Sequence, residues 1–305
     1  MFEEYLEINQ ENARHLSFET DYVVIHDPQP AALVESRSTQ NKWIWRCHID
    51  ISRPLWKVWG FLRRFVANYD AAVFSLPRFA QRIPIPQMLI YPAIDPLSDK
   101  NRDLSSEEYS KILSRLNIPT DKPMLLQVSR FDRFKDPLGV IQTYRLVKKH
   151  HDVQLVLAGG EATDDPEGKV VLSEVMGAVR DDPDIRVLLL PPDANLEINA
   201  LQRAATIVLQ KSLREGFGLT VAEAMWKGKP VIGSNAGGIT VQLVYGVTGF
   251  TVSSVEGAAF RIHYLLDNPE VMIKIGEDGK EYVRQNFLIT RKLGDWLALM
   301  NYLGR

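Results

Sequence analysis

Residues 214–225 read Arg-Glu-Gly-Phe-Gly-Leu-Thr-Val-Ala-Glu-Ala-Met and follow an apolar run at 205–210. This order predicts a strand, a glycine-bearing turn and then a helix. The first backbone N–H groups of a helix lack internal partners, so such a turn forms a site for anions. Glu215 lies before the predicted helix and Glu223 near its first turns. The two carboxylates could hold hydroxyl-bearing parts of a ligand on either side of its phosphates, as in a sugar nucleotide. The simpler alternative is that acids merely complement the helix dipole.

A second candidate anion site follows the apolar run 124–128. Arg130 and Lys135 are five residues apart across a predicted turn, so both could contact one anion. A guanidinium fork and a lysine point charge suit the two phosphates of a departing nucleotide. The alternative is that both are solvated cations beside Asp132 and Asp136.

Strands and helices alternate along the chain, which predicts an α/β fold with parallel sheets covered on both faces. Ligands of such sheets bind beyond the carboxyl ends of the strands, where the candidate motifs lie. Strands are expected at 21–26, 42–47, 71–74, 87–90, 124–128, 153–158, 185–190, 205–210, 230–233 and 249–252, and helices at 3–15, 54–69, 137–150, 168–180 and 195–203. A polar linker is expected between 96 and 123.

The composition excludes several classes of protein. A chain of 305 residues usually forms two domains. The net charge of −2 indicates neither nucleic-acid nor membrane affinity. The single cysteine, Cys47, lies in an apolar run and is expected to be a buried structural thiol in a reducing compartment. No apolar run could span a bilayer, and residues 1–4 do not resemble a signal peptide. A cytoplasmic location is expected.

The stretch at 214–225 resembles the E-x7-E signature of retaining glycosyltransferases with the GT-B fold, specifically family 4. The resemblance extends to Val-Ser-Arg-Phe-Asp-Arg-Phe-Lys-Asp-Pro at 128–137 and Ser-Asn-Ala-Gly-Gly-Ile at 234–239. With His-Asp-Pro-Gln at 26–29 and Trp-Arg-Cys-His-Ile-Asp at 45–50, the chain resembles the trehalose glycosyltransferring synthases over essentially its whole length. The resemblance implies two Rossmann-like domains.

The resemblance also implies roles for individual residues. Arg130 and Lys135 would hold the diphosphate and stabilise the charge that grows as the sugar–phosphate bond breaks. Glu215 would bind a donor-sugar hydroxyl and Glu223 the ribose. His48 would lie near the donor hexose and the reaction centre; its alternative is a satisfied core histidine.

Glycines and carboxylates complete the set of candidates. Backbone N–H groups of Gly218, Leu219 and Thr220 are expected to bind phosphate. Gly237 and Gly238 form either a plain turn or a close approach to the ligand. The acceptor candidates at the first-domain strand ends are Asp27 and Asp50, since carboxylates suit sugar hydroxyls; Asp27 could instead be a turn or cap residue.

The expected domains are 1–95, a partial acceptor-side Rossmann-like domain, and 96–285, a nucleotide-sugar-binding one. A helix at 286–305 is expected to pack back on the first. Members of the resembled family open with a strand and a Gly-rich loop, and neither is present here, so the first domain is expected to be truncated. Such a sheet would expose an edge and favour association, including a homodimer.

The expected reaction is transfer of glucose from a nucleoside-diphosphate glucose, such as UDP-glucose or ADP-glucose, to glucose, giving α,α-trehalose. No cofactor and no metal are expected, because no cluster has metal-ligand spacing. The nucleotide base would lie around residues 190–198, without a readable preference. The alternatives are a trehalose phosphorylase, a sucrose or polysaccharide synthase, and a non-catalytic sugar- or nucleotide-binding form.

Overall fold

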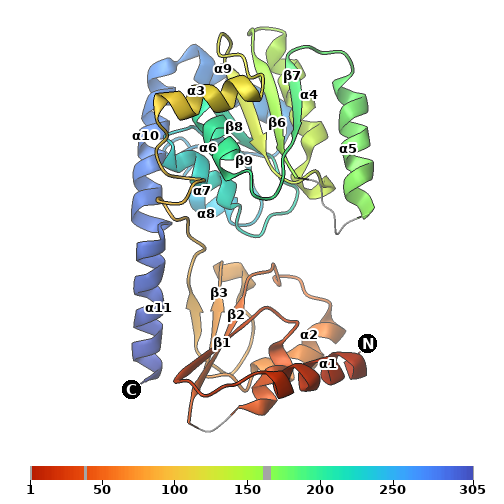
Figure 1. The fold of residues 1–305 in the computed structure, drawn as a ribbon, viewed down its shortest axis with the longest axis vertical. Helices are drawn as coiled ribbons and strands as arrows, with labels where there is room; N and C mark the ends of the chain where they lie inside the picture. Colours follow the sequence, from red (N-terminus) through yellow and green to blue (C-terminus); the bar gives the residue numbers. More distant parts are fainter. Residues whose placement is uncertain (1, 38–39, 161–165, 305) are drawn as a thin grey trace. The chain divides into compact units, whose positions relative to one another are not determined.

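The computed structural model describes residues 2–37, 40–160 and 166–304 (Figure 1). These form two compact units, Met1–Pro92 with Thr290–Arg305, and Ala93–Ile289. Each unit contains one sheet in which all strand pairs are parallel. The predicted α/β class with two parallel sheets is confirmed.

The sheet of the first unit has four strands in sequential order. They are β1 (Tyr22–His26), β2 (Lys42–Cys47), β3 (Ala71–Phe74) and β4 (Gln87–Leu89). The accompanying helical segments are α1 (Phe2–His15), η1 (Ala31–Ser36), α2 (Trp56–Val66), η2 (Pro77–Phe79) and α11 (Ile289–Leu303).

Both faces of this first sheet are covered. Ile44 of β2 packs in one cluster with Leu299 of α11. The next residue, Trp45, points to the other face, as alternation along a strand requires. Its ring lies 6.2 Å from that of Trp59 on α2 and 5.9 Å from that of Phe74, between ring centroids. Coverage of both faces explains why β2 and β3 are almost continuously apolar.

The second unit contains a six-stranded sheet with the order β10-β9-β8-β5-β6-β7. Its strands are β5 (Met124–Val128), β6 (Gln154–Gly159), β7 (Ile185–Leu189), β8 (Ile207–Gln210), β9 (Val231–Ser234) and β10 (Phe250–Val252). Its helical segments are α3 (Ser106–Arg115), η3 (Arg133–Lys135), α4 (Pro137–Lys148), α5 (Pro166–Val179), α6 (Asn195–Ala204), α7 (Leu219–Trp226), α8 (Ile239–Gln242), α9 (Val255–Asp267) and α10 (Pro269–Asn286).

Two helix layers enclose this sheet (Figure 1): α4 contacts α5 and α9, while α6 contacts α3 and α7. The strand order reverses between β5 and β8, because the chain continues outward through β6 and β7 on one side and through β9 and β10 on the other. Such a reversal opens a crevice beyond the carboxyl ends of the two central strands. The loops after β5 and β8 carry the two anion motifs.

The sequence predicted a polar linker between residues 96 and 123. The structure shows that this segment also contains a helix, α3. Ser105 caps this helix: its hydroxyl accepts from the Glu108 N–H, and the Glu108 carboxylate accepts from the Ser105 N–H. The Ser-x-x-Glu spacing of this capping box was a usable signal. Ile112 and Leu113 are buried, and α3 packs on α6.

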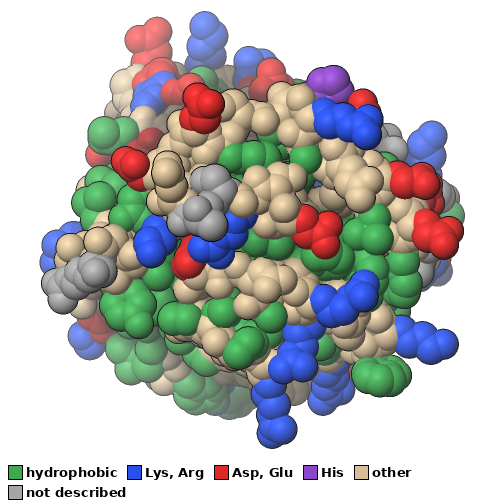
Figure 2. Space-filling view, turned by 90° about the horizontal axis from the view of Figure 1, so that it is seen from below, with side chains coloured by type: hydrophobic (Ala, Val, Ile, Leu, Met, Phe, Trp, Pro, Cys, Tyr) green, Lys and Arg blue, Asp and Glu red, His purple; other side chains and the backbone are tan. Residues whose placement is uncertain are grey.

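The face of the molecule shown in Figure 2 carries both acidic and basic side chains, mixed with hydrophobic ones. This mixture agrees with the small net charge. Within the described ranges, no helix has both the length and the apolar character required of a membrane span.

Candidate functional site

The predicted residues fall into two groups, one in each unit. In the second unit, the loop after β5 contacts the loop after β8 through an ion pair. Lys135 Nζ donates to Glu215 Oε2 at 2.7 Å, and the two side chains are only 19% and 8% exposed. Ser212 Oγ and Gln210 Nε2 donate to the same oxygen at 3.0 and 3.3 Å. The structure therefore brings together two of the predicted catalytic residues, 80 positions apart.

Local hydrogen bonds set the position of Lys135. The Asp132 carboxylate accepts from the Lys135 N–H at 3.0 Å, and the Gln127 side chain donates to the Lys135 carbonyl at 2.7 Å. Asp136 then turns the chain with a left-handed φ of 50° and caps α4. These contacts fix the lysine backbone independently of its ion pair.

Arg130 lies on the same loop but is far more exposed. Its guanidinium is 3.7 Å from the Asp132 carboxylate, and its side chain is 58% exposed. Arg130 thus offers an accessible cation on the loop that also carries the mostly buried Lys135 side chain.

The turn into α7 has the conformation that an anion site requires. Gly218 is the N-cap of α7 with φ of +80°, a region that favours glycine. The helix starts at Leu219, so the N–H groups of its first turn are available without a helical partner. The Thr220 hydroxyl donates to Gln210 Oε1 at 3.2 Å. Thr220 would therefore contribute its backbone N–H, and not its hydroxyl, to an anion site.

Glu223 lies one turn further along α7 and is 5% exposed. Its carboxylate is 3.9 Å from Lys100 Nζ and 3.5 Å from Gln202 Nε2. Both contacts are long, so the acid retains capacity for a stronger hydrogen-bond donor. Lys100 and Gln202 were missed, because neither belongs to a motif and both reach Glu223 only through the packing.

Close packing against the protein itself explains why positions 237 and 238 are glycines, and the sequence did not predict this packing. A Cβ on Gly237 would lie 1.7 Å from the Glu215 carbonyl oxygen, and one on Gly238 2.5 Å from the Phe217 ring. The close approach is therefore to the loop that carries Glu215. Backbone contact of these glycines with a ligand stays a prediction.

In the first unit, the ends of β1 and β2 are joined at Asp27 and His48. The Asp27 carboxylate accepts from the His48 N–H at 2.7 Å, and its carbonyl accepts from the Trp45 indole at 2.9 Å. The His48 ring is hydrogen-bonded to His26, Nε2 to Nδ1, at 2.8 Å, with the rings stacked. Asp50 accepts from the Ser52 N–H at 2.9 Å within its own turn.

Desolvation and the charges of neighbouring groups lower the pKa of His48. The largest cause is desolvation of the ring, followed by the charge of Arg46; the Asp27 charge opposes them, and His26 and Lys292 add to the lowering. The lowered pKa favours the neutral form of His48. Arg46 is itself 1% exposed, donates to Ser75 Oγ at 3.0 Å, and has its pKa lowered to about 10 by burial.

Sequence reasoning missed Arg46 and Lys292. An arginine inside an apolar strand was the available signal, since buried charges are rare without a reason. Lys292 of α11 could not be found in this way, because more than 200 residues of chain separate it from β2. Cys47 is buried, as expected, and burial raises the pKa of its thiol to about 12.

The remaining sequence expectations concern groups away from these two loops. Residues 190–198, expected near the base, follow β7 and begin α6. Across the part of the chain that the structure covers, no three His, Cys, Asp or Glu side chains are arranged to hold a metal ion.

Comparison with known proteins adds independent evidence. Residues 109–282 match the family model Glycosyl transferases group 1, and residues 1–81 match Trehalose synthase, N-terminal domain. The Trehalose synthase of Pyrococcus horikoshii is 46% identical over 100% of this chain and 74% of its own length. That of Rubrobacter xylanophilus is 44% identical over 97% and 73%. A solved structure, trehalose-6-phosphate from E. coli bound with UDP-2-fluoro glucose, is 14% identical with a TM-score of 0.79, over 98% of this chain and 78% of that one.

The fold and the loops after β5 and β8 define a GT-B hexosyltransferase. The chain belongs to the group 1 glycosyltransferases and, within them, to the trehalose synthase family. It is thus a trehalose-related glycosyltransferase, as its sequence predicted.

Proposed function

We propose that this enzyme transfers a glucosyl unit from a nucleoside-diphosphate glucose to glucose, with retention of configuration, giving α,α-trehalose and the nucleoside diphosphate. The observation that carries the proposal is the Lys135–Glu215 ion pair at the entry to α7. It places a cation, a carboxylate and free helical N–H groups at the switch point of one sheet.

The ion pair suits a ligand that carries both phosphates and hydroxyls. A diphosphate becomes a counter-ion for Lys135, which frees Glu215 to accept from a sugar hydroxyl. Arg130 and the first N–H groups of α7 then bind the remaining phosphate oxygens. Because negative charge grows on the leaving phosphate as the bond breaks, these fixed donors stabilise the transition state more than the ground state. The proposed reaction needs no metal and no cofactor.

Glu223 is the proposed ribose ligand. Its two contacts in the structure are long, so ribose hydroxyls could replace or join them. The E. coli protein of similar fold, bound with UDP-2-fluoro glucose, supports a sugar nucleotide as donor. A phosphorylase would have no ribose for this acid to bind.

The acceptor is proposed to bind at the strand ends of the first unit. One Asp27 carboxylate oxygen is used by the His48 N–H, which leaves the other for an acceptor hydroxyl. Neutral His48 can exchange hydrogen bonds with a hexose without acting as a cation. Asp50, held by its own turn, is the second acceptor candidate. The leaving phosphate would take the proton of the attacking hydroxyl.

A product assay tests the proposal. The protein is incubated with glucose and either UDP-glucose or ADP-glucose, and the product is identified by NMR. We expect a non-reducing α,α-1,1 disaccharide with stoichiometric nucleoside diphosphate. Glucose 1-phosphate formed from trehalose and inorganic phosphate would instead establish a phosphorylase. A product formed with fructose but not with glucose would establish a sucrose synthase. Binding of the nucleotide without any product would establish a non-catalytic sensor.

A further inference from the structure

A hollow in the second unit lies away from the loops after β5 and β8. It has a volume of about 300 Å³ and is lined by Leu104, Ser106, Tyr109, Arg203, Lys227 and Lys229. Three of these side chains are cations and two carry hydroxyl groups, while none is an acid. Such a lining matches the donors that an anion needs.

The two lysines lack carboxylate partners. Lys227 Nζ donates to Asn101 Oδ1 at 3.0 Å and to the Glu223 carbonyl at 3.2 Å, both uncharged acceptors. The Lys229 backbone N–H donates to the Ala224 carbonyl at 3.1 Å, while its ammonium group makes no hydrogen bond or ion pair with the residues that the structure describes. Only Arg203 has an acidic partner here, the 96% exposed Asp103, at 2.8 Å. The hollow therefore gathers three basic side chains that share a single carboxylate partner, Asp103.

The hollow lies at the opposite end of α7 from the proposed diphosphate site. Lys227 is the C-cap of α7, whose first residue is Leu219, so the helix separates the two sites by about 12 Å. The partial negative charge at a helix C-terminus would by itself attract a lysine. It does not explain why Arg203 of α6 and Lys229, beyond the helix, converge on the same space.

We propose that this hollow is a second anion site, which binds the phosphate group of a small phosphate-bearing molecule. A phosphate dianion offers enough acceptor oxygens for three cations and the hydroxyls of Ser106 and Tyr109. The volume is at the lower end of the range for small-molecule sites and accommodates a molecule the size of a hexose phosphate.

The state of Lys227 provides an additional signature. Burial, with the nearby charges of Arg203 and Lys100, lowers its pKa to about 7 against the opposing effect of Glu223. Burial likewise lowers the pKa of Lys229. A bound dianion favours the charged form of each lysine and raises its pKa. Binding at pH 7.5 should therefore take up protons from the solution.

Calorimetric titration with inorganic phosphate and with glucose 6-phosphate tests the site, with glucose as the neutral control. Because phosphate could also bind beside Lys135, the titration is made in the wild type and in Lys135→Met. We expect saturable binding that persists in Lys135→Met and weakens at least tenfold in Lys229→Met. Lys111→Met, which removes an exposed lysine of α3 outside the hollow, should change it less than twofold.

We expect the Ser106→Glu variant to fold normally, because Ser106 is exposed and an acid in the first turn of α3 is compatible with the helix. It should abolish binding by repulsion. Titration in two buffers of different ionisation enthalpy should reveal proton uptake that is lost in Lys227→Met. Equal affinities for the two probes would mean that the protein recognises the phosphate group alone. Tighter binding of glucose 6-phosphate would mean that the sugar also contacts the protein.

Two results would overturn the proposal. One is the loss of all phosphate binding in Lys135→Met, which would assign the anion to the diphosphate site. The other is unchanged binding in both Lys229→Met and Ser106→Glu. Neither result bears on trehalose formation, which is measured separately.

Discussion

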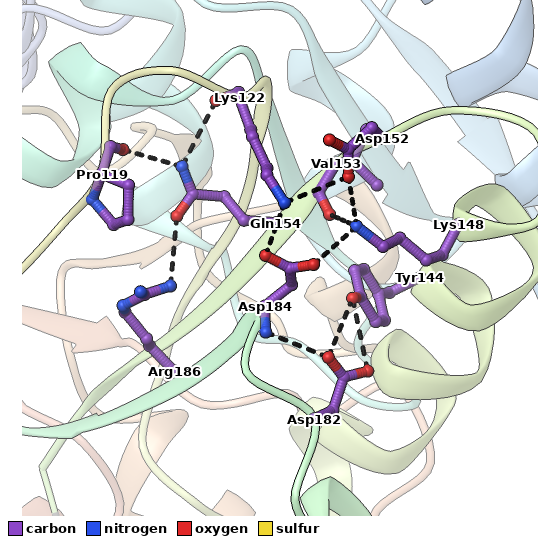
Figure 3. Close-up of polar contacts among 10 residues, drawn as sticks. All are labelled: Pro119, Lys122, Tyr144, Lys148, Asp152, Val153, Gln154, Asp182, Asp184 and Arg186. Carbon is purple, nitrogen blue, oxygen red and sulfur yellow. Dashed lines mark hydrogen bonds and ion pairs between the residues drawn. The ribbon is translucent and has the colours of Figure 1, made fainter.

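The two ends of the second sheet use charged residues in contrasting ways. At the carboxyl end, Lys135 and Glu215 form one mostly buried pair between two loops. At the amino end, Asp184 lies between Lys148 at 2.7 Å and Lys122 at 3.0 Å (Figure 3). Asp152 contacts the same two lysines. Here each charge has two partners, and the side chains of the lysines are more than a quarter exposed.

This difference separates a binding arrangement from a structural one. The amino-end network joins the starts of β5, β6 and β7 and the end of α4, so it stabilises neighbouring elements against one another. The carboxyl-end pair joins loops beside free helical N–H groups, and in the proposed function a ligand replaces either member. We expect substitutions at one end to affect catalysis and those at the other to affect folding.

The largest expected effect is that of Lys135→Ala. Loss of its charge contact with the leaving diphosphate should remove about 2–4 kcal/mol of transition-state stabilisation, measured as a fall in kcat/KM of roughly 30- to 1000-fold. Lys148→Ala is the matched control, because it removes a paired lysine from the other end of the same sheet. Near-normal turnover of Lys135→Ala would show that the assignment of this lysine is wrong.

Glu223→Gln should have the next largest effect, and on donor binding in particular. Replacing a charged acceptor of the ribose hydroxyls should weaken binding of the nucleoside diphosphate by about 1.5–3 kcal/mol. Calorimetry should show this loss for the nucleoside diphosphate but not for pyrophosphate, which has no ribose. Equal losses for both ligands would contradict a ribose role.

A smaller effect is expected from Asp184→Asn at the amino end. Two lysine pairs are weakened, but solvent screening limits the cost to about 0.5–1 kcal/mol. Thermal unfolding should show a modestly lower Tm with kcat unchanged. The hydrogen bonds from Lys148 and then Lys122 lower the pKa of the Asp184 carboxyl. Its stabilisation is therefore present above the unfolded pKa, near 4, and is lost as the pH falls through the folded pKa. The gap between wild type and variant should narrow in acid; a constant gap would contradict this origin.

The smallest expected effect is a shift in the pKa of His48, at the carboxyl end of the first sheet. Because burial and Arg46 lower the pKa of His48, its imidazole signal in an NMR titration should shift with a midpoint below the usual 6.5. Arg46→Met removes one cause, so the midpoint should rise. A wild-type midpoint at or above 6.5 would be inconsistent with this environment.

Much of the fold was accessible from the sequence because the strands are apolar and the breaks between them are clear. The runs at 42–47 and 124–128 became β2 and β5 as predicted. The α3 helix was missed because its polar face resembles a linker, although its capping box was visible. The Arg46 environment was missed because its neighbours come from three separate segments.

The glycines show where pattern reasoning reached its limit. A turn that needs φ above zero, as at Gly218, is indicated by the residue type itself. The sequence does not reveal what a glycine approaches. At Gly237 the neighbour is the Glu215 backbone, which is distant in sequence and close only through folding.

The sequence alone determined the local elements and which charged residues follow which strand, since periodicity and turn chemistry act over a few positions. Only the tertiary structure decided that β5 lies beside β8, which brings Lys135 to Glu215 across 80 residues. Strand order depends on how helices pack against both faces of the whole sheet. That packing energy is collective, and no short stretch of the chain encodes it.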